Sequence, residues 1–484
     1  MQIPRLASLA RDDRGSPSAP LPPRPVLFTI ARAIGAAVAL AVVACSGGDG
    51  TAPVAAACYA DFGTPASGAG IVTIDPTSRF QTMQGFGTTE RLFDDPHVTE
   101  TYNQSTQRAG VIPPAADQAK ILDALYTQIG LTRVRFHPDL IEPVNDNADP
   151  NAADLAKFDF SWQKSDGHIA YIKRLLPLGV TTYFASPVTI EPWMTTANPA
   201  EYAEWVIVLL RHWRDQGLEM PYYSIINEPG YVRSGIWPGT WIRDVIKILG
   251  PRLAAEGLKT KLVVPDDWSA GEALARLQVI LADATARQYI GAVAYHLYNR
   301  GGETEVKQLA QQYDIPVWMT EFSTGDDWFQ WATVMQQEIA DFGASAVDYM
   351  WGYFGDWDKS QLIRIRTNNG TYAGFDFNRQ YYVMGQYSKF VRPGAIRVGA
   401  SSGESDVKVA AFLAGVQEIV VATNTGTSSH TVQFELGNGP CASRVDAVRT
   451  SGTEGLQPLP SITLDRTRFS TTLPARSVTT FVGR

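Results

Sequence analysis

The stretch Tyr222-Tyr223-Ser224-Ile225-Ile226-Asn227-Glu228-Pro229 decides how the rest of the chain is interpreted. Tyrosine, isoleucine and serine suit an enclosed strand, and Pro229 followed by Gly230 stops the hydrogen-bonded ladder immediately afterwards. An amide and a carboxyl, those of Asn227 and Glu228, are left at the tip. The stretch therefore predicts a buried strand with polar side chains at its carboxyl end.

A second apolar segment, Ile315 to Phe322, repeats this design and places Glu321 near its end. In a closed (β/α)₈ barrel the carboxyl ends of the strands converge on one pocket. Two carboxyls that face each other across a pocket can hydrolyse a glycosidic bond, one as acid and one as nucleophile. An Asn-Glu-Pro triplet also occurs in ordinary turns, and an acid at a strand end is often a helix N-cap, so the surrounding strand order has to decide.

Strand and helix patterns alternate about eight times through the segment 83–391. This alternation favours a parallel sheet closed by helices, an α/β TIM barrel. The rival is a doubly wound open sheet, but no Gly-rich phosphate loop follows any strand. Gly85 and Gly87 in the first strand allow close backbone approach. The predicted barrel strands are 83–87, 131–136, 180–185, 222–228, 261–265, 290–298, 315–322 and 346–353.

From about residue 392 to residue 484 the helical periodicity gives way to short alternating runs separated by Gly, Ser, Thr and Asn. This pattern predicts a C-terminal antiparallel β-sandwich. The segment 58–82 precedes the barrel and is expected to add one or two strands to this sandwich. The side domain would then be built from both ends of the chain.

Composition and the N-terminal segment limit the partners and the location. The net charge of −8 offers no basic stripe for nucleic acid, so none is expected as a partner. Residues 1–45 have arginines, an apolar run too short to span a bilayer, and small residues before Cys45, which is typical of an export signal. The signal resembles a bacterial lipobox, which implies a lipid on Cys45 as the only membrane contact; a plain signal peptide is the alternative.

Residues 46–57 then form a flexible tether. We expect an exported lipoprotein held at the outer membrane or cell surface, or otherwise a secreted or periplasmic protein, and in either case a monomer. Cys58 and Cys441 remain after Cys45, and an oxidising compartment favours one disulfide between them. Two unpaired buried thiols are the alternative.

Several motifs come in a fixed order and together resemble glycoside hydrolase family 30, over roughly residues 70 to 484. That family belongs to the retaining (β/α)₈ glycosidases, with the acid on strand four and the nucleophile on strand seven. The motifs are Gly85-Phe86-Gly87, the Arg133 strand, Ser186-Pro187 with Pro192-Trp193-Met194, Asn227-Glu228-Pro229, His296-Leu297-Tyr298, Trp318-Met319-Thr320-Glu321 and the block from Tyr382 to Gly394.

The resemblance implies that Glu228 is the acid/base and Glu321 the nucleophile. It further implies that Arg133 lies beside Glu321 and keeps it charged, because an adjacent cation lowers a carboxyl pKa. Glu228, facing that negative charge, is expected to act as the proton donor. The other implied substrate-binding residues are Asn227 at the sugar 2-hydroxyl, His296 on the floor, Tyr298 bonded to Glu321, and the aromatic side chains Trp193 and Trp351.

The chain departs from the family pattern at places that bear on the substrate. Glucuronoxylan-cleaving members use an arginine just after strand eight, where this chain has acids at Asp356 and Asp358; Arg364 and Arg366 come later. An acidic rim favours neutral sugars, so the expected substrate is a neutral β-linked glycan, either xylan-type or a β-1,6-linked glucan or galactan.

No cofactor or metal is expected. The six histidines lack paired ligand spacing, and a faint calcium-loop pattern at 145–149 has Pro150 where such a loop needs glycine. The competing class is a non-catalytic surface lipoprotein that binds glycan. Both carboxyls are present, which favours the enzyme.

Overall fold

The computed structural model describes residues 67–95, 98, 111–195, 198–231, 236–437 and 442–484. Cys45, Cys58 and Cys441 lie outside these residues, so the lipid anchor and the disulfide stay predictions. Within the described part of the chain, no helix is both long and apolar enough to cross a bilayer.

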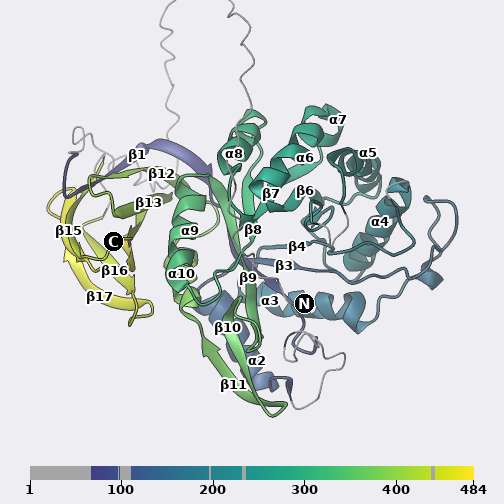
Figure 1. Cartoon of the computed structure of the whole chain (residues 1–484), viewed down its shortest axis with the longest axis horizontal. Helices are drawn as coiled ribbons and strands as arrows, with labels where there is room; N and C mark the ends of the chain where they lie inside the picture. Colours follow the sequence, from purple (N-terminus) through teal and green to yellow (C-terminus); the bar gives the residue numbers. More distant parts are fainter. Residues whose placement is uncertain (1–66, 96–97, 99–110, 196–197, 232–235, 438–441) are drawn as a thin grey trace, which may run out of the picture. The chain divides into compact units, whose positions relative to one another are not determined.

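Eight parallel strands form a closed barrel, as the alternation predicted (Figure 1). The ring closes because the last strand pairs with both the first and the seventh. The barrel strands are rich in Val, Ile, Leu and Ala, and they are buried on both faces. The strands are β2 (Gly85–Glu90), β3 (Arg133–Phe136), β4 (Thr182–Ala185), β5 (Tyr222–Ser224), β6 (Lys261–Ser269), β7 (Ile290–Asn299), β8 (Val317–Glu321) and β9 (Ala344–Gly355).

Helices cover the outside of the barrel between successive strands (Figure 1). The helix that precedes β3 is α-helical over Ala115–Leu122 and then widens into a π-helical segment, Asp123–Gln128, before Gly130 ends it in a left-handed conformation. The α-helices are α2 (Ala115–Leu122), α3 (Gly167–Leu175), α4 (Pro199–Asp215), α5 (Gly239–Ala255), α6 (Ala270–Ala282), α7 (Ala284–Arg287), α8 (Glu303–Gln312), α9 (Trp328–Ala340) and α10 (Arg379–Ser388).

The close approach expected at the first strand is present. A Cβ on Gly87 would lie 2.6 Å from the carbonyl oxygen of Arg133 and 2.5 Å from Asp348 Oδ1. No side chain fits at this position, because the backbone of β3 and the Asp348 side chain of β9 come too close to the α-carbon of Gly87.

A hairpin that the sequence analysis did not predict follows the barrel. Strand β10 (Gln361–Asn368) runs parallel to the end of β9, and β11 (Thr371–Phe377) returns antiparallel to β10. Asn369 and Gly370 join them, both with positive φ (50° and 71°). This is the Asn-Gly turn that suits a two-residue hairpin loop.

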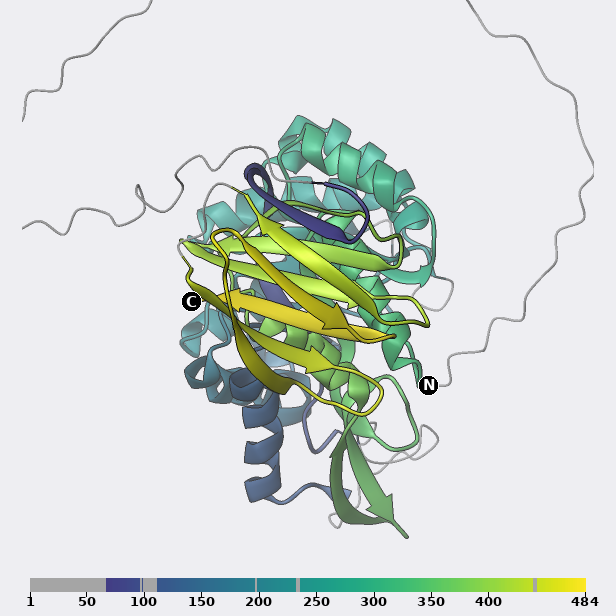
Figure 2. The ribbon, with the colours of Figure 1, turned by 90° about the vertical axis from the view of Figure 1, so that its left-hand side faces the viewer.

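The remaining strands form one nine-stranded, mostly antiparallel sheet that includes the predicted N-terminal strand (Figure 2). The order is β17-β16-β19-β14-β13-β12-β1-β15-β18, with β1 parallel to β15 and antiparallel to β12. The strands are β1 (Ile71–Thr82), β12 (Ile396–Ser402), β13 (Val407–Ala414), β14 (Gln417–Asn424), β15 (His430–Leu436), β16 (Arg444–Thr450), β17 (Gln457–Thr463), β18 (Arg468–Leu473) and β19 (Ser477–Gly483).

This sheet folds over onto itself as a sandwich. Phe481 of β19 lies five places from β15 in the strand order, yet its ring centroid is 4.9 Å from that of Phe434 and 5.1 Å from that of Phe469. Hydrogen bonds join the sandwich to α10: Thr480 Oγ1 donates to the carbonyl oxygen of Gln386 at 2.7 Å, both atoms being buried.

Candidate active site

Glu228 and Glu321 meet at the carboxyl ends of the barrel strands. Glu321 is the last residue of β8. Strand β5 is shorter than predicted and ends at Ser224, after which Glu228 adopts a positive φ of 50°. Two hydrogen bonds hold this tip, from Asn227 N to the carbonyl of Pro187 and from Glu228 N to that of Asp266, each 2.8 Å.

The two carboxylates are close together. One ligating atom from each of Glu228, His296 and Glu321 lies within 4.8 Å of the other two. A retaining glycosidase needs its two carboxyls about 5 Å apart, whereas an inverting one needs room for a water between them. The separation therefore fits direct attack by one of the carboxylates on a bound sugar.

Glu321 is almost completely buried, and two neighbours bind its carboxylate. Arg135 Nη1 lies 2.5 Å from Oε2, and the Tyr298 hydroxyl donates to Oε1 at 2.8 Å. Burial alone would raise the pKa of Glu321, but the positive charges of His296 and Arg135 outweigh it and lower the pKa. Glu321 is thus a carboxylate at neutral pH.

The expected neighbour of Glu321 was wrong: Arg135, and not Arg133, holds this carboxylate. Both arginines point into the barrel, because alternate residues of a strand share a face. Arg133 begins β3 and makes a bidentate pair with Asp348, with both N–O distances 3.0 Å. Its guanidinium lies 4.0 Å from the centroid of the Trp318 ring. Arg133 is therefore part of the deeper barrel core and does not reach the carboxyl-end pocket.

His296 lies between the two glutamates, on the floor where it was expected. Its Nδ1 is 3.0 Å from Glu228 Oε1 and 3.9 Å from Glu321 Oε1, and its Nε2 is 3.4 Å from Asp266 Oδ1. Burial opposes a charge on the ring, but Glu321 and Asp266 together raise the pKa of His296 to about 10. The imidazole is consequently protonated at neutral pH.

Asp266 is a central residue that the sequence analysis missed. Ser186 Oγ and Thr320 Oγ1 each donate to it at 2.5 Å, and Arg135 Nη2 lies 3.4 Å away. Burial alone would raise its pKa, but Arg135 and His296 lower it well below the usual range. Its position after the apolar run of β6, at the carboxyl end of a barrel strand, was the available signal.

Asn227 is anchored by Arg135, whose Nη2 donates to its Oδ1. The Arg135 guanidinium thus binds both the side-chain amide of Asn227 and the carboxylate of Glu321. The arrangement places the predicted 2-hydroxyl contact and the predicted nucleophile in a constant relation to each other. Arg135 had no place in the predicted site, although it lies only two residues beyond the arginine that was chosen.

Each of the two predicted tryptophans contacts a neighbouring side chain or carbonyl group. Trp351 stacks on Phe354 with ring centroids 4.7 Å apart and presents an edge toward His137. The indole N–H of Trp193 donates to the carbonyl oxygen of Glu142 at 2.7 Å. Each ring is therefore held in place by a neighbour, as a platform for a sugar would need to be.

The trio of Glu228, His296 and Glu321 also has the geometry of a metal-ligand set. His296 is protonated, however, and Arg135 already bonds Glu321, so two protein cations face the carboxylates. A further cation would meet repulsion at this point, because like charges in a buried site destabilise each other.

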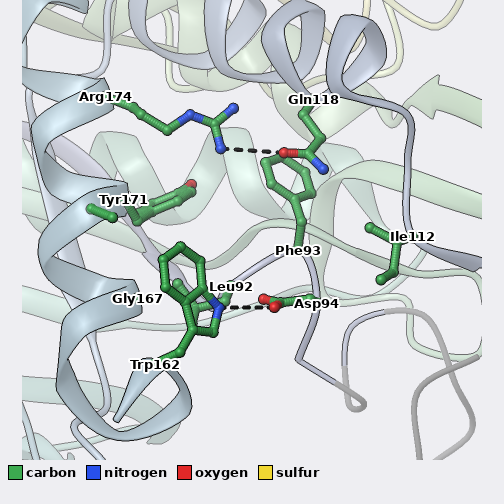
Figure 3. Close-up of a pocket in the computed structure, with 10 residues that line it drawn as sticks. Leu92, Phe93, Asp94, Ile112, Gln118, Trp162, Gly167, Tyr171 and Arg174 are labelled. Atoms are coloured by element: carbon green, nitrogen blue, oxygen red, sulfur yellow. Dashed lines mark hydrogen bonds between the residues drawn. The ribbon is translucent and has the colours of Figure 1, made fainter. Parts of the chain in front are cut away.

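A cavity of about 290 Å³ opens elsewhere, between the segment after β2 and the helices α2 and α3 (Figure 3). Trp162 donates its indole N–H to Asp94 at 2.8 Å on one wall, and Arg174 donates to Gln118 at 3.2 Å on another. None of the predicted site residues lines this cavity. It is therefore distinct from the pocket that holds the two glutamates.

Comparisons with known proteins agree with this geometry. The family model described as the glycosyl hydrolase catalytic core matches residues 252–353. Glucuronoxylanase XynC of Bacillus subtilis (strain 168) is 28% identical over 304 residues, which make up 58% of this chain and 66% of the relative, slightly under two thirds. Endo-1,6-beta-D-glucanase neg1 of Aspergillus fumigatus is 24% identical over 265 residues, 50% of this chain and 51% of the relative.

Among solved structures, the glycoside hydrolase family 30 subfamily 8 xylanase Xyn30A from Clostridium acetobutylicum superimposes with a TM-score of 0.66 at 25% identity, covering 86% of this chain and 99% of that one. A closed (β/α)₈ barrel with a side sandwich and two adjacent glutamates at its carboxyl end defines the class of barrel glycosidases. These similarities support a glycoside hydrolase of family 30, in agreement with the resemblance of its motifs.

Proposed function

We propose that the protein is a retaining glycoside hydrolase of β-linked glycans, with Glu321 as nucleophile and Glu228 as acid/base. The observation that carries the proposal is the separation of these two side chains, whose nearest ligating atoms lie within 4.8 Å. This distance leaves too little room for the water that an inverting mechanism places between its carboxyls.

In the first step, the ionised Glu321 attacks the anomeric carbon, the glycosidic C–O bond breaks, and the departing oxygen takes up a proton, so that the rest of the glycan leaves as an alcohol. That proton comes from the pair formed by Glu228 and the protonated His296, which are 3.0 Å apart. In the second step, Glu228 takes a proton from water, and the resulting hydroxide releases the sugar from Glu321. Tyr298 and Arg135 hold the nucleophile in line throughout.

The substrate class is a neutral glycan, either xylan-type or a β-1,6-linked glucan or galactan. The arginines nearest to the expected uronate position, Arg364 and Arg366, both pair with Asp376, at 2.8 Å and 3.0 Å. Both guanidinium groups are therefore engaged by the same acid, which balances one of their two charges. A glucuronoxylanase and an endo-1,6-beta-D-glucanase among the relatives support this range.

The test is the release of reducing ends from xylan, glucuronoxylan, β-1,6-glucan, β-1,6-galactan and aryl β-glycosides. We expect Glu321→Ala and Glu228→Ala each to remove nearly all activity while the proteins remain folded. The first-formed product anomer, followed by NMR, should retain the configuration of the substrate. An inverted first product, or substantial turnover by either variant, would rule out the assignment.

The second candidate is a surface glycan-binding lipoprotein without activity. It predicts that glycan binds but that no reducing ends appear from any member of the panel. Both candidates share the proposed export and anchoring through Cys45. Mass spectrometry of the mature N-terminus in a bacterial host tests this: a diacylated Cys45 is expected, and release of the Cys45→Ser protein from the membrane should follow.

A further inference from the structure

Four buried or half-buried carboxylates gather outside the catalytic pocket, where the segment after β3 meets the first turns of α4. Glu142 and Asp146 come from that segment, and Glu201 and Glu204 lie three residues apart on one face of α4. Glu142, Glu201 and Glu204 are 1%, 8% and 4% exposed. Nothing in the proposed mechanism uses them.

Three oxygens of this acidic cluster have no hydrogen-bond donor in the described part of the chain: Asp146 Oδ1, Glu201 Oε2 and Glu204 Oε1. A buried carboxylate oxygen without a partner is costly. Their unmet lone pairs are therefore the feature that requires an explanation.

The nearest cation, Arg252, lowers the pKa of Glu201 and of Glu204 but compensates the cluster only in part, because burial and the neighbouring acids raise both. Arg252 of α5 donates hydrogen bonds to acceptors outside the cluster. These are the carbonyl oxygens of Pro150 at 2.8 Å and Ala200 at 3.3 Å, and the side-chain oxygen of Asn151 at 3.0 Å. Burial, followed by repulsion from Asp146, raises the pKa of Glu204 to about 7. In the described residues, the acids of this cluster thus outnumber the cations that act on them.

We propose that this acidic cluster binds a divalent cation of the calcium class. Hard cations with flexible coordination take six to eight oxygen ligands, several of them carboxylates. The donor set here consists of oxygen atoms only, and its free oxygens match that preference. In the described residues, the one set of three ligating side chains already within 4.8 Å is the catalytic trio, so the carboxylates of the cluster must converge on the ion.

Hydrogen bonds extend from the cluster to Trp193, one of the predicted substrate-binding residues. Asp146 N donates to Glu142 Oε1 at 3.0 Å, and Glu142 N donates to Glu191 Oε1 at 2.6 Å. The carbonyl of Glu142 accepts the indole N–H of Trp193. A bound cation would hold the segment after β3 against α4 and keep Trp193 in place.

The experiment measures thermal unfolding of the purified protein after EDTA treatment and removal of the chelator. We expect Ca²⁺ to raise the Tm in a saturable way, with a dissociation constant on the order of 10⁻⁴ M or tighter. The double variant Glu201→Gln/Glu204→Gln should weaken Ca²⁺ binding at least tenfold, because binding strength follows the ligand charge count. Without Ca²⁺ it should melt no lower than the wild type, since buried charge has been removed.

Two control variants locate the ion. Glu418→Gln removes a buried carboxylate of β14, both oxygens of which have no hydrogen-bond partner among the described residues, and should leave the Ca²⁺ response unchanged. Glu321→Gln removes a ligand of the catalytic trio and should also leave it unchanged. Any of three results would overturn the proposal. The first is a wild-type Tm that does not change with Ca²⁺, the second is an undiminished rise of Tm in the double variant, and the third is loss of the rise in Glu321→Gln. None of these readouts depends on hydrolytic activity.

Discussion

Replacing Arg135 tests whether its charge sets the ionisation of the nucleophile. Opposite charges about 4 Å apart interact by about 4 kcal/mol at an effective dielectric constant of about 20, which corresponds to about three pKa units. His296 remains beside Glu321 in the variant, so part of the stabilisation is kept. We therefore expect Arg135→Gln to move the acid limb of the pH profile of kcat/KM upward by about 1–2 pH units.

Arg133 provides the matched control, because it lies on the same strand and is equally buried. Arg133→Gln breaks the buried ion pair with Asp348, and Arg135→Gln breaks the buried ion pair with Glu321. Either break should lower the free energy of unfolding by about 3–5 kcal/mol.

Only the change at Arg135 should move the acid limb, measured on an aryl β-glycoside. If the glutamine variants do not fold, Arg135→Lys and Arg133→Lys replace them. Equal displacement of the limb in both variants, or none in the Arg135 variant, would refute the reasoning.

Three further predictions follow from single positions. His296→Asn removes the largest favourable charge acting on Glu321, so the acid limb should again rise; an unmoved limb would contradict the pKa argument. Burial raises the pKa of Glu90 from 4.5 to about 8, so wild-type stability should fall as pH rises through that window; urea denaturation of Glu90→Gln should lack this slope. Gly87→Ala should cost about 1–3 kcal/mol because its Cβ meets β3, whereas Gly452→Ala, with open space around it, should be neutral in thermal unfolding.

The barrel was predictable because its signals are local. Apolar runs ending in Glu228 and Glu321 and the helical periodicity between them need no knowledge of distant contacts. The hairpin β10–β11 was also readable, since Asn369-Gly370 between alternating residues is a strong turn signal.

The choice between Arg133 and Arg135 was harder from sequence alone. Both face the barrel interior, and only the stagger between neighbouring strands decides which of them reaches the level of Glu321. Strand alternation gives the face of a residue but not its depth in a barrel. Asp266 was missed for a related reason: its donors, Ser186 just beyond β4 and Thr320 on β8, are far from it in the chain.

The catalytic pocket and the acidic cluster contain the same kind of side chain under opposite electrostatic conditions. In the pocket, Arg135 and His296 are buried with the acids, and the pKa of Glu321 falls despite burial. At α4 the half-buried Arg252 is the described cation beside the acids, and burial still raises the pKa of Glu204 to about 7. A carboxylate that the fold keeps charged serves as a nucleophile, whereas a group of carboxylates left without a full counter-charge is suited to take its cation from solution.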